Sequence, residues 1–156
     1  MNTTTFLMLA PSILLGLTLH EFAHGWVADR LGDPTSRMNG RLTLNPLAHL
    51  DPLGTIMLFV LHFGWAKPVP VNPMMFKNPK KDMLLVAIAG PITNFLLAAL
   101  FGLLLRFMGS PENSTTTVLT TMLQYGVIIN ISLMLFNMLP IPPLDGSRVL
   151  RAVVPD

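Results

Sequence analysis

Three long apolar segments dominate the sequence, and few charged residues fall within them. No Asp, Glu, Lys or Arg precedes Glu21, and residues 83–105 and 113–144 carry none either. A helix needs about 20 apolar residues to cross a bilayer core of roughly 30 Å. The pattern therefore predicts three transmembrane helices, at Phe6 to about Ala28, Met83–Leu105 and Thr117–Leu139.

The segment between the first two predicted spans holds shorter elements. A fourth apolar run, residues 53–65, has only 13 residues, which is typical of a re-entrant or interfacial segment. Two alternating stretches, 40–44 and 67–71, are predicted to be strands. In the second stretch two prolines lack an N–H on one edge, whereas Val69 and Val71 keep theirs on the other, so it is expected to pair normally on one side only. The predicted fold is an all-α polytopic membrane protein with about three transmembrane helices, one re-entrant or interfacial segment and a small β element.

Composition agrees with a membrane protein and excludes several other classes. Of the 156 residues, 51% are hydrophobic and 12% are charged, whereas a soluble domain carries roughly 25% charged residues. This low charge density excludes a water-soluble monomer, and the high hydrophobicity excludes a disordered chain. The absence of cysteine excludes a disulfide scaffold and a thiolate metal site. A net charge of +2 gives no indication of a nucleic-acid partner.

The distribution of basic residues predicts the orientation in the membrane. They lie in residues 29–82 or after residue 147, except for Arg106, which borders an otherwise neutral connection at 107–116. If residues 53–65 do not cross the bilayer, every basic group except Arg106 lies on one face. Cytoplasmic loops carry the excess of Lys and Arg, so this face is predicted to be cytoplasmic. The N-terminus lacks a basic start and a small-residue cleavage site, so we expect no removable signal peptide and a multi-pass protein of the cell membrane.

The first predicted span contains three ionisable residues within five positions, His20-Glu21-Phe22-Ala23-His24. Such residues are costly inside a membrane and are functional candidates. On a helix His20 and His24 lie about 40° apart, so both imidazoles can bind one metal ion. Glu21 lies about 100° from His20 and is placed to reach a metal-bound water. This is the His-Glu-x-x-His pattern of zinc hydrolases. The alternative is a pair of interior histidines with a stray acid.

A catalytic zinc usually has three protein ligands plus water, so a third ligand is needed. Asp145 is the main candidate, because it follows three prolines that end the last predicted span. Its alternative role is an N-cap of the turn that follows, Ser147–Val153. His49 and Asp51 are rival ligands, although we expect a loop His and Asp to be solvated or turn-forming. His62 stands alone on an apolar run and is expected to be a packed or interfacial histidine.

Three motifs, in this order along residues 20–146, resemble the site-2 protease family of intramembrane zinc metalloproteases. They are His20-Glu-x-x-His24, Gly90-Pro91-Ile-Thr-Asn94 and Asn137-x-x-Pro140-x4-Asp145-Gly146. Residues 45–54 and 64–73 are similar to the compact prokaryotic subgroup of this family, which lacks a PDZ domain.

The resemblance implies a catalytic site. His20, His24 and Asp145 are implied to hold one zinc ion per chain. Glu21 is implied to act as general base and then as general acid. Asn137 is implied to donate a hydrogen bond to the developing oxyanion.

The resemblance also implies contacts with the substrate. Asn94 is expected to hold the substrate backbone. Apart from the resemblance, the one-sided edge of Lys67–Asn72 leads us to expect that an extended substrate segment pairs there as an added strand, at Val69 and Val71. For both Asn94 and Asn137 the alternative is hydrogen bonding between helices. Gly90 is expected to permit a close helix contact rather than to act in catalysis.

The expected function is that of an intramembrane zinc endopeptidase, which uses zinc-activated water to hydrolyse peptide bonds in or near transmembrane segments of membrane-protein substrates. His20 precedes Ala28 by eight residues, which places the zinc about 12 Å from the basic end of the helix, nearer the cytoplasm. Two alternatives are a membrane metal transporter or channel and an inactive relative that binds helices. A transporter would leave Glu21 without a task, and an intact Glu21 argues against an inactive relative.

The sequence is expected to form a single membrane-embedded metalloprotease core over residues 1–156. Members of the family usually continue past the Asp-Gly motif with at least one more membrane helix. The chain is therefore expected to be either a shortened form or a minimal catalytic core.

Overall fold

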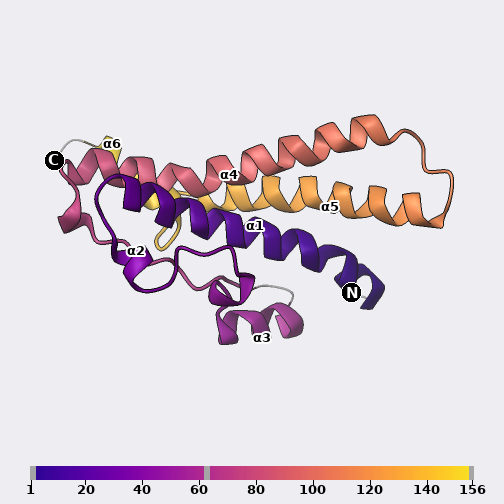
Figure 1. Ribbon diagram of the computed structural model, residues 1–156, viewed down its shortest axis with the longest axis horizontal. Helices are drawn as coiled ribbons and strands as arrows, with labels where there is room; N and C mark the ends of the chain where they lie inside the picture. The colour runs from indigo at the N-terminus through magenta and orange to yellow at the C-terminus, as the bar shows by residue number, and fades with distance from the viewer. Residues whose placement is uncertain (1–2, 62–63, 155–156) are drawn as a thin grey trace.

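Three long helices that pack on one another form the body of the protein. The computed structural model describes residues 3–61 and 64–154. The long helices are α1 (Thr3–Arg30), α4 (Pro79–Met108) and α5 (Ser114–Asn137), and each packs against the other two. In Figure 1 the connection between α4 and α5 lies at one end of the long axis, and the C-terminus lies at the other, beside the start of α4. All three helices are long and apolar enough to cross a membrane, which confirms the predicted spans.

Local sequence signals set the ends of the long helices. Helix α4 begins at Pro79, whose fixed φ suits the first turn of a helix. It ends before Gly109, which has a φ of 68° in the left-handed region. Helix α5 begins after a capping box, in which the Asn113 side chain accepts from the Thr116 N–H and the Thr116 side chain accepts from the Asn113 N–H.

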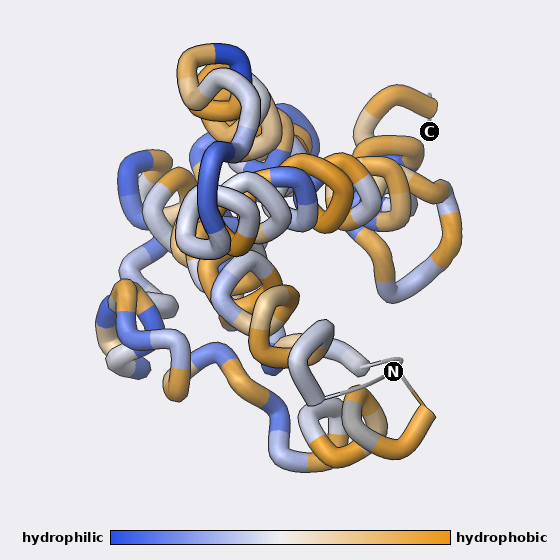
Figure 2. Tube along the Cα trace, turned by 90° about the vertical axis from the view of Figure 1, so that its right-hand side faces the viewer, coloured by the Kyte–Doolittle hydropathy of each residue, from blue (hydrophilic) through white to orange (hydrophobic). Residues whose placement is uncertain are grey.

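The outer faces of the long helices carry exposed apolar side chains, among them Leu96, Leu103 and Phe107 on α4 and Ile128 on α5. Figure 2 shows hydrophobic stretches, in orange, along the helices. Exposed apolar surface on this scale marks a membrane or partner contact. The exposed apolar side chains on α4 and α5 therefore agree with helices that face lipid.

Shorter elements connect and flank the three long helices. They are α2 (Thr35–Met38), η1 (Pro46–Ala48), α3 (Pro52–Leu61), η2 (Pro73–Met75) and α6 (Asp145–Val153). Helix α3 has ten residues and is not one of the three helices long enough to cross a membrane, in agreement with the short segment predicted there. The predicted environment of His62 lies outside the described residues.

The predicted β element is wrong. Within residues 3–61 and 64–154, the only strand-like pairing is an isolated bridge between Leu50 and Ala66. The stretch 40–44 begins with Gly40 at a φ of 64°, which suits a turn. The stretch 67–71 lacks two N–H groups at its prolines, and the N–H of Val69 donates to a side chain instead of a strand. Residues 67–71 therefore lie as a single extended segment beside α1.

Candidate metal site

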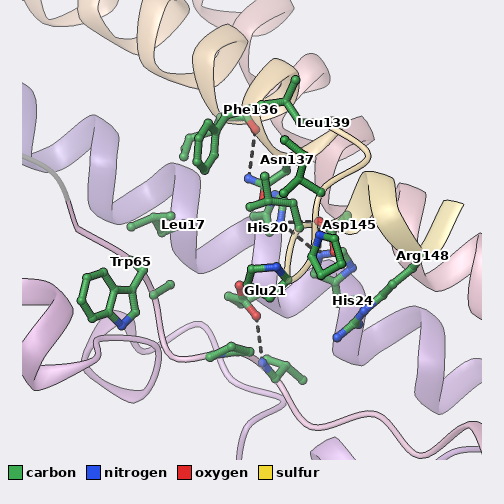
Figure 3. A pocket seen from close by; sticks show the side chains of 18 of the residues that line it. Leu17, His20, Glu21, His24, Trp65, Phe136, Asn137, Leu139, Asp145 and Arg148 are labelled. Atoms are coloured by element: carbon green, nitrogen blue, oxygen red, sulfur yellow. Dashed lines mark hydrogen bonds and ion pairs between the residues drawn. The ribbon is translucent and has the colours of Figure 1, made fainter. Parts of the chain in front are cut away.

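The three side chains predicted as metal ligands converge at one point in the helix bundle. His20 and His24 lie one turn apart on α1, and Asp145 is the first residue of α6. The Nε2 atoms of the two histidines are 3.0 Å apart, and each lies 3.1 Å from Oδ2 of Asp145 (Figure 3). All three residues are buried, with exposed fractions of 4%, 6% and 8%. Among the described residues, they form the group of ionisable side chains that could hold a metal ion.

Each imidazole is oriented by a hydrogen bond at its other nitrogen. The Nδ1 of His24 donates to the carbonyl oxygen of Val86 on α4 at 2.7 Å. The Nδ1 of His20 lies 2.6 Å from Oδ1 of Asn94, also on α4. A bond at Nδ1 leaves Nε2 to present its lone pair, which is how metal-binding histidines are commonly oriented.

The turn between α5 and α6 carries Asp145 back to the histidines. Helix α5 ends at Asn137, and α6 begins at Asp145 with Leu144 as its N-cap. No side-chain cap hydrogen bond forms there, so the alternative role of Asp145 as an N-cap is not what the structure shows. Gly146 lets α6 approach this turn, because a Cβ at that position would lie 2.2 Å from the Met138 carbonyl oxygen. The carboxylate of Asp145 is therefore directed at His20 and His24.

Gly90 leaves the space in which the three ligand atoms meet. A Cβ at this position would lie 2.4 Å from His24 Nε2 and 2.6 Å from His20 Nε2. Real Cβ atoms essentially never show contacts shorter than 3.0 Å. Helix α4 can therefore approach the two histidines only because residue 90 has no side chain, which agrees with the close helix contact expected there.

The donor set fits zinc. Two imidazole nitrogens and one carboxylate oxygen are common zinc ligands. Tetrahedral zinc with bonds of about 2.0–2.1 Å holds its ligand atoms roughly 3.3 Å apart. The separations of 3.0–3.1 Å in the structure are close to this value. Three protein ligands also leave one position open, as catalytic zinc sites do.

A cavity of about 580 Å³ opens beside the three ligand atoms. Its wall includes Glu21, Asn137 and the half-buried Arg148, together with Val69 of the extended segment. Figure 3 shows Glu21 beside His20, with its carboxylate directed toward the extended segment. The Oε2 of Glu21 accepts a hydrogen bond from the Val69 N–H at 2.9 Å. The cluster that could hold a metal ion and the Glu21 carboxylate thus share one cavity.

Comparison with known protein families identifies the chain. A model of the family described as Peptidase family M50 matches residues 8–156. The chain belongs to peptidase family M50. This membership, with the relatives below, confirms the resemblance to the site-2 protease family. It also confirms the predicted class, a metalloprotease, and zinc as its cofactor.

Two curated relatives of this M50 peptidase come from bacteria. "Putative zinc metalloprotease YwhC" of Bacillus subtilis is 44% identical over 151 residues, which cover 94% of this chain and 69% of the relative. "Putative zinc metalloprotease Rip2" of Mycobacterium tuberculosis is 33% identical over 152 residues, which cover 94% of this chain and 57% of the relative. This chain therefore spans 57–69% of the length of these two relatives. No solved structure matches it significantly.

The two asparagines of the M50 motifs have different surroundings. Asn137 lines the cavity, and its Nδ2 donates to the Leu133 carbonyl at 2.9 Å. Asn94 has no exposed surface and lies behind His20, where its side chain bonds to His20, Gly16 and Asn130. This placement does not support the predicted contact between Asn94 and substrate, because the hydrogen bonds of Asn94 are directed at neighbouring helices.

The extended segment beside the M50 site is anchored along its length. Asp33 accepts from the Asn72 N–H at 2.6 Å, and Ser36 donates to the Pro70 carbonyl at 2.7 Å. Val69 lines the cavity, whereas Val71 packs against the small core formed around Phe76. The segment is therefore fixed in place beside Glu21.

The rival ligands lie elsewhere and have other partners. His49 Nε2 donates to the Thr43 carbonyl at 2.8 Å. Asp51 accepts from the Gly54 N–H at 2.8 Å in the first turn of α3. These contacts are turn-forming, as expected for a loop His and Asp.

Two residues near the M50 site were not singled out from sequence. Arg148 lies one turn beyond Asp145, and its position on α6 could have indicated that it faces the cavity. Asn130 is a buried amide in the apolar helix α5 and contacts Asn94. An amide within an uncharged span was the available signal for Asn130.

Proposed function

We propose that this M50 peptidase is an intramembrane zinc endopeptidase that hydrolyses peptide bonds in or near the transmembrane segments of membrane-protein substrates. The observation that carries the proposal is the position of the metal-binding cluster. His20, Glu21 and His24 lie within α1, a helix long and apolar enough to span a membrane, and they share one cavity. Ionisable residues at such a position are costly and serve function.

In the proposed site, His20, His24 and Asp145 hold one zinc ion, which lowers the pKa of water and polarises the scissile carbonyl. Glu21 follows His20 directly and lines the same cavity, so it is placed to take the proton of the attacking water and to pass it to the leaving amine. The hydrogen bond from the Val69 N–H holds the Glu21 carboxylate at the cavity wall.

Asn137 is assigned to the oxyanion that develops on the scissile carbonyl. Its amide has two hydrogens, and one of them is used by the Leu133 carbonyl. The residue lines the cavity, so the second hydrogen is the group assigned to the oxyanion. A donor placed in this way stabilises charge as it forms.

An apolar cavity adjoining the catalytic one supports a transmembrane substrate. It has a volume of about 620 Å³, is lined by residues of α1, α3 and α5, and shares Leu17, Leu133 and Phe136 with the catalytic cavity. The membrane-spanning part of the substrate occupies this apolar space. The part to be cleaved must unwind, because a helix hides its carbonyls in internal hydrogen bonds.

The unwound part of the substrate pairs with residues 67–71 as an added strand, through the carbonyl of Val69 and the N–H of Val71, because the Val69 N–H is already donated to Glu21. This segment is already extended and anchored, and Val69 faces the cavity. Replacing Val69 by Pro removes its N–H and is expected to lower cleavage strongly without loss of zinc. Val69→Pro could lower cleavage by displacing Glu21 or by blocking the pairing with substrate. Val71→Pro blocks the pairing alone, because it leaves the hydrogen bond between the Val69 N–H and Glu21 in place. Unchanged cleavage in both variants would remove the segment from the mechanism.

The catalytic site is proposed to lie nearer the cytoplasmic face of the cell membrane. The end of α1 that carries His24 continues to Arg30, and the basic residues of 29–82 follow it. Arg106 lies at the opposite end, near the connection between α4 and α5. An excess of Lys and Arg marks the cytoplasmic side.

Glu21→Gln tests the proposed function, and Glu112→Gln is a matched control. These are the two glutamates of the sequence, and Glu112 is exposed in the connection before α5. Each variant and the unaltered protein are produced as the full chain in cells that lack other M50 peptidases. New N-termini of membrane proteins are then mapped by mass spectrometry, and zinc is measured on the purified proteins.

The expected result is that Glu21→Gln keeps zinc and loses every cleavage made by the unaltered protein, while Glu112→Gln keeps both. Cleavage that persists in Glu21→Gln would contradict the assignment of the base. Purified protein without zinc would contradict the metal site, and cleavage confined to water-exposed loops far from any span would contradict the intramembrane substrate.

A further inference from the structure

Two buried asparagines connect helix α5 to the imidazole of His20. Asn130 on α5 and Asn94 on α4 have no exposed surface. The Nδ2 of Asn130 donates to the carbonyl of Gly126 at 2.9 Å. The Nδ2 of Asn94 donates to Oδ1 of Asn130 at 2.9 Å, and Oδ1 of Asn94 lies 2.6 Å from Nδ1 of His20. A buried amide is costly unless it is hydrogen-bonded, and both amides here have partners.

Two backbone carbonyls fix the direction of this chain of hydrogen bonds. A carbonyl oxygen only accepts, so the group of Asn130 that faces Gly126 is its NH2, and its oxygen faces Asn94. The NH2 of Asn94 also donates to the Gly16 carbonyl at 3.2 Å. The oxygen of Asn94 therefore faces His20, whose Nδ1 must be the protonated nitrogen.

We propose that Asn130 is a positioning residue for the metal site, which acts through Asn94 to hold His20 in the tautomer that presents the Nε2 lone pair to zinc. The inference rests on the proposed ligation of zinc by His20. Without an acceptor at position 130, only the longer bond to Gly16 orients the Asn94 amide. A reversed amide would donate to Nδ1 of His20 and leave the ring proton on Nε2, where it blocks the metal.

Gly16 leaves the space for this arrangement. A Cβ at position 16 would lie 2.9 Å from Oδ1 of Asn130, so α1 and α5 can approach closely enough only with glycine there. The carbonyl of the same residue receives the second hydrogen of Asn94. Three helices thus contribute to the orientation of one imidazole.

His24 provides an internal reference. Its Nδ1 donates directly to the backbone carbonyl of Val86, which needs no side chain to orient it. A change at Asn130 is therefore expected to alter the tautomer of His20 and to leave that of His24 unchanged.

The test combines Asn130→Leu, which has a similar volume and no acceptor, with the background Asn94→Asp. A carboxylate at position 94 accepts from Nδ1 of His20 in either orientation, so it makes position 130 unnecessary. The full chain is labelled with ¹⁵N-histidine and studied in detergent without metal, and the shifts of the ring nitrogens report the tautomer of each histidine. Zinc affinity is measured by competition with a chromophoric chelator. Thr121→Val is the control, because it removes a hydrogen bond on an exposed face of α5.

In the native background, Asn130→Leu is expected to move His20 toward the tautomer protonated at Nε2 and to weaken zinc binding about 10–100-fold. In the Asn94→Asp background, the same change is expected to have no effect on either quantity. Asn130→Ala, which introduces a smaller side chain than Leu, is measured in parallel and is expected to change the His20 tautomer and the zinc affinity in the same way. Unchanged His20 signals and zinc affinity in the folded Asn130 variants would overturn the proposal, and so would an equal loss in both backgrounds. Zinc binding by the unaltered protein tests the metal site separately.

Discussion

Replacement of Gly90 by Ala is the sharpest test of the geometry of the metal site. The added methyl group would lie 2.4 Å from Nε2 of His24 and 2.6 Å from both Cε1 and Nε2 of His20. Ordinary van der Waals contact begins at 3.4 Å, so at least one ring must move by about 1 Å, because repulsion rises steeply at shorter range. Metal–ligand distances tolerate only about 0.2 Å. The two imidazoles cannot both remain in position.

The expected loss of zinc affinity is at least about 100-fold, the upper end of what is lost when a single outer partner of a ligand is removed. This corresponds to about 2.8 kcal/mol of binding free energy. Helix propensity acts in the opposite direction, because Ala is favoured over Gly by about 1 kcal/mol within a helix. A folded protein that has lost its zinc is therefore the expected product, rather than an unfolded one.

Gly102→Ala is the matched control on the same helix, since a Cβ at that position would meet nothing within 4 Å. Both variants are purified in detergent, their helix content is measured by circular dichroism, and their zinc affinity is measured by chelator competition. Gly102→Ala is expected to bind zinc as the unaltered protein does. If Gly90→Ala binds one zinc per chain with unchanged affinity, the close approach of α4 to the two histidines is wrong.

Three further outcomes follow from the same structure. Asp145→Asn is expected to weaken zinc binding by about 100-fold or more, whereas Asp51→Asn should leave the zinc affinity unchanged. If chelator competition shows the larger loss in Asp51→Asn, Asp51 is the ligand. Gly126→Ala places a Cβ 2.5 Å from the Phe101 ring and should cost about 1–3 kcal/mol of stability, so an unchanged melting temperature in detergent would refute the packing of α4 on α5. Zinc should be released as the pH falls, since protons compete for the imidazole nitrogens, and retention of zinc in acid dialysis would argue against imidazole ligands.

The spans and the pairing of His20 with His24 could be predicted because their signals are local. A charge-free run of sufficient length indicates a helix across the bilayer whatever packs beside it. The spacing of His20 and His24 places both on one face of that helix without any other part of the chain. The structure agrees on both points, with α1 extending over Thr3–Arg30 and the two Nε2 atoms 3.0 Å apart.

The strand predictions failed because alternation alone does not supply a partner. Residues 67–71 do adopt an extended backbone beside α1, but only the Lys67 N–H donates to a neighbouring backbone, at His49, whereas Val69 and Pro70 bond to the side chains of Glu21 and Ser36. Prolines at two of these positions limit what a ladder could gain. The segment lies instead at the wall of the cavity beside Glu21, where we propose that a substrate peptide pairs with it.

The positions of the asparagines depend on contacts that no local pattern encodes. Asn94 and Asn137 both belong to motifs, and the motifs do not say which faces the cavity and which faces the neighbouring helices. The answer follows from helix packing, because the partners of Asn94 are distant in the sequence. Asn130 is 36 positions away and His20 is 74 positions away. In an apolar bundle a polar side chain is stable only where another group meets it. The orientation of His20 is therefore a property of three packed helices, and a substitution on α5 that touches neither zinc nor substrate is expected to alter the metal site.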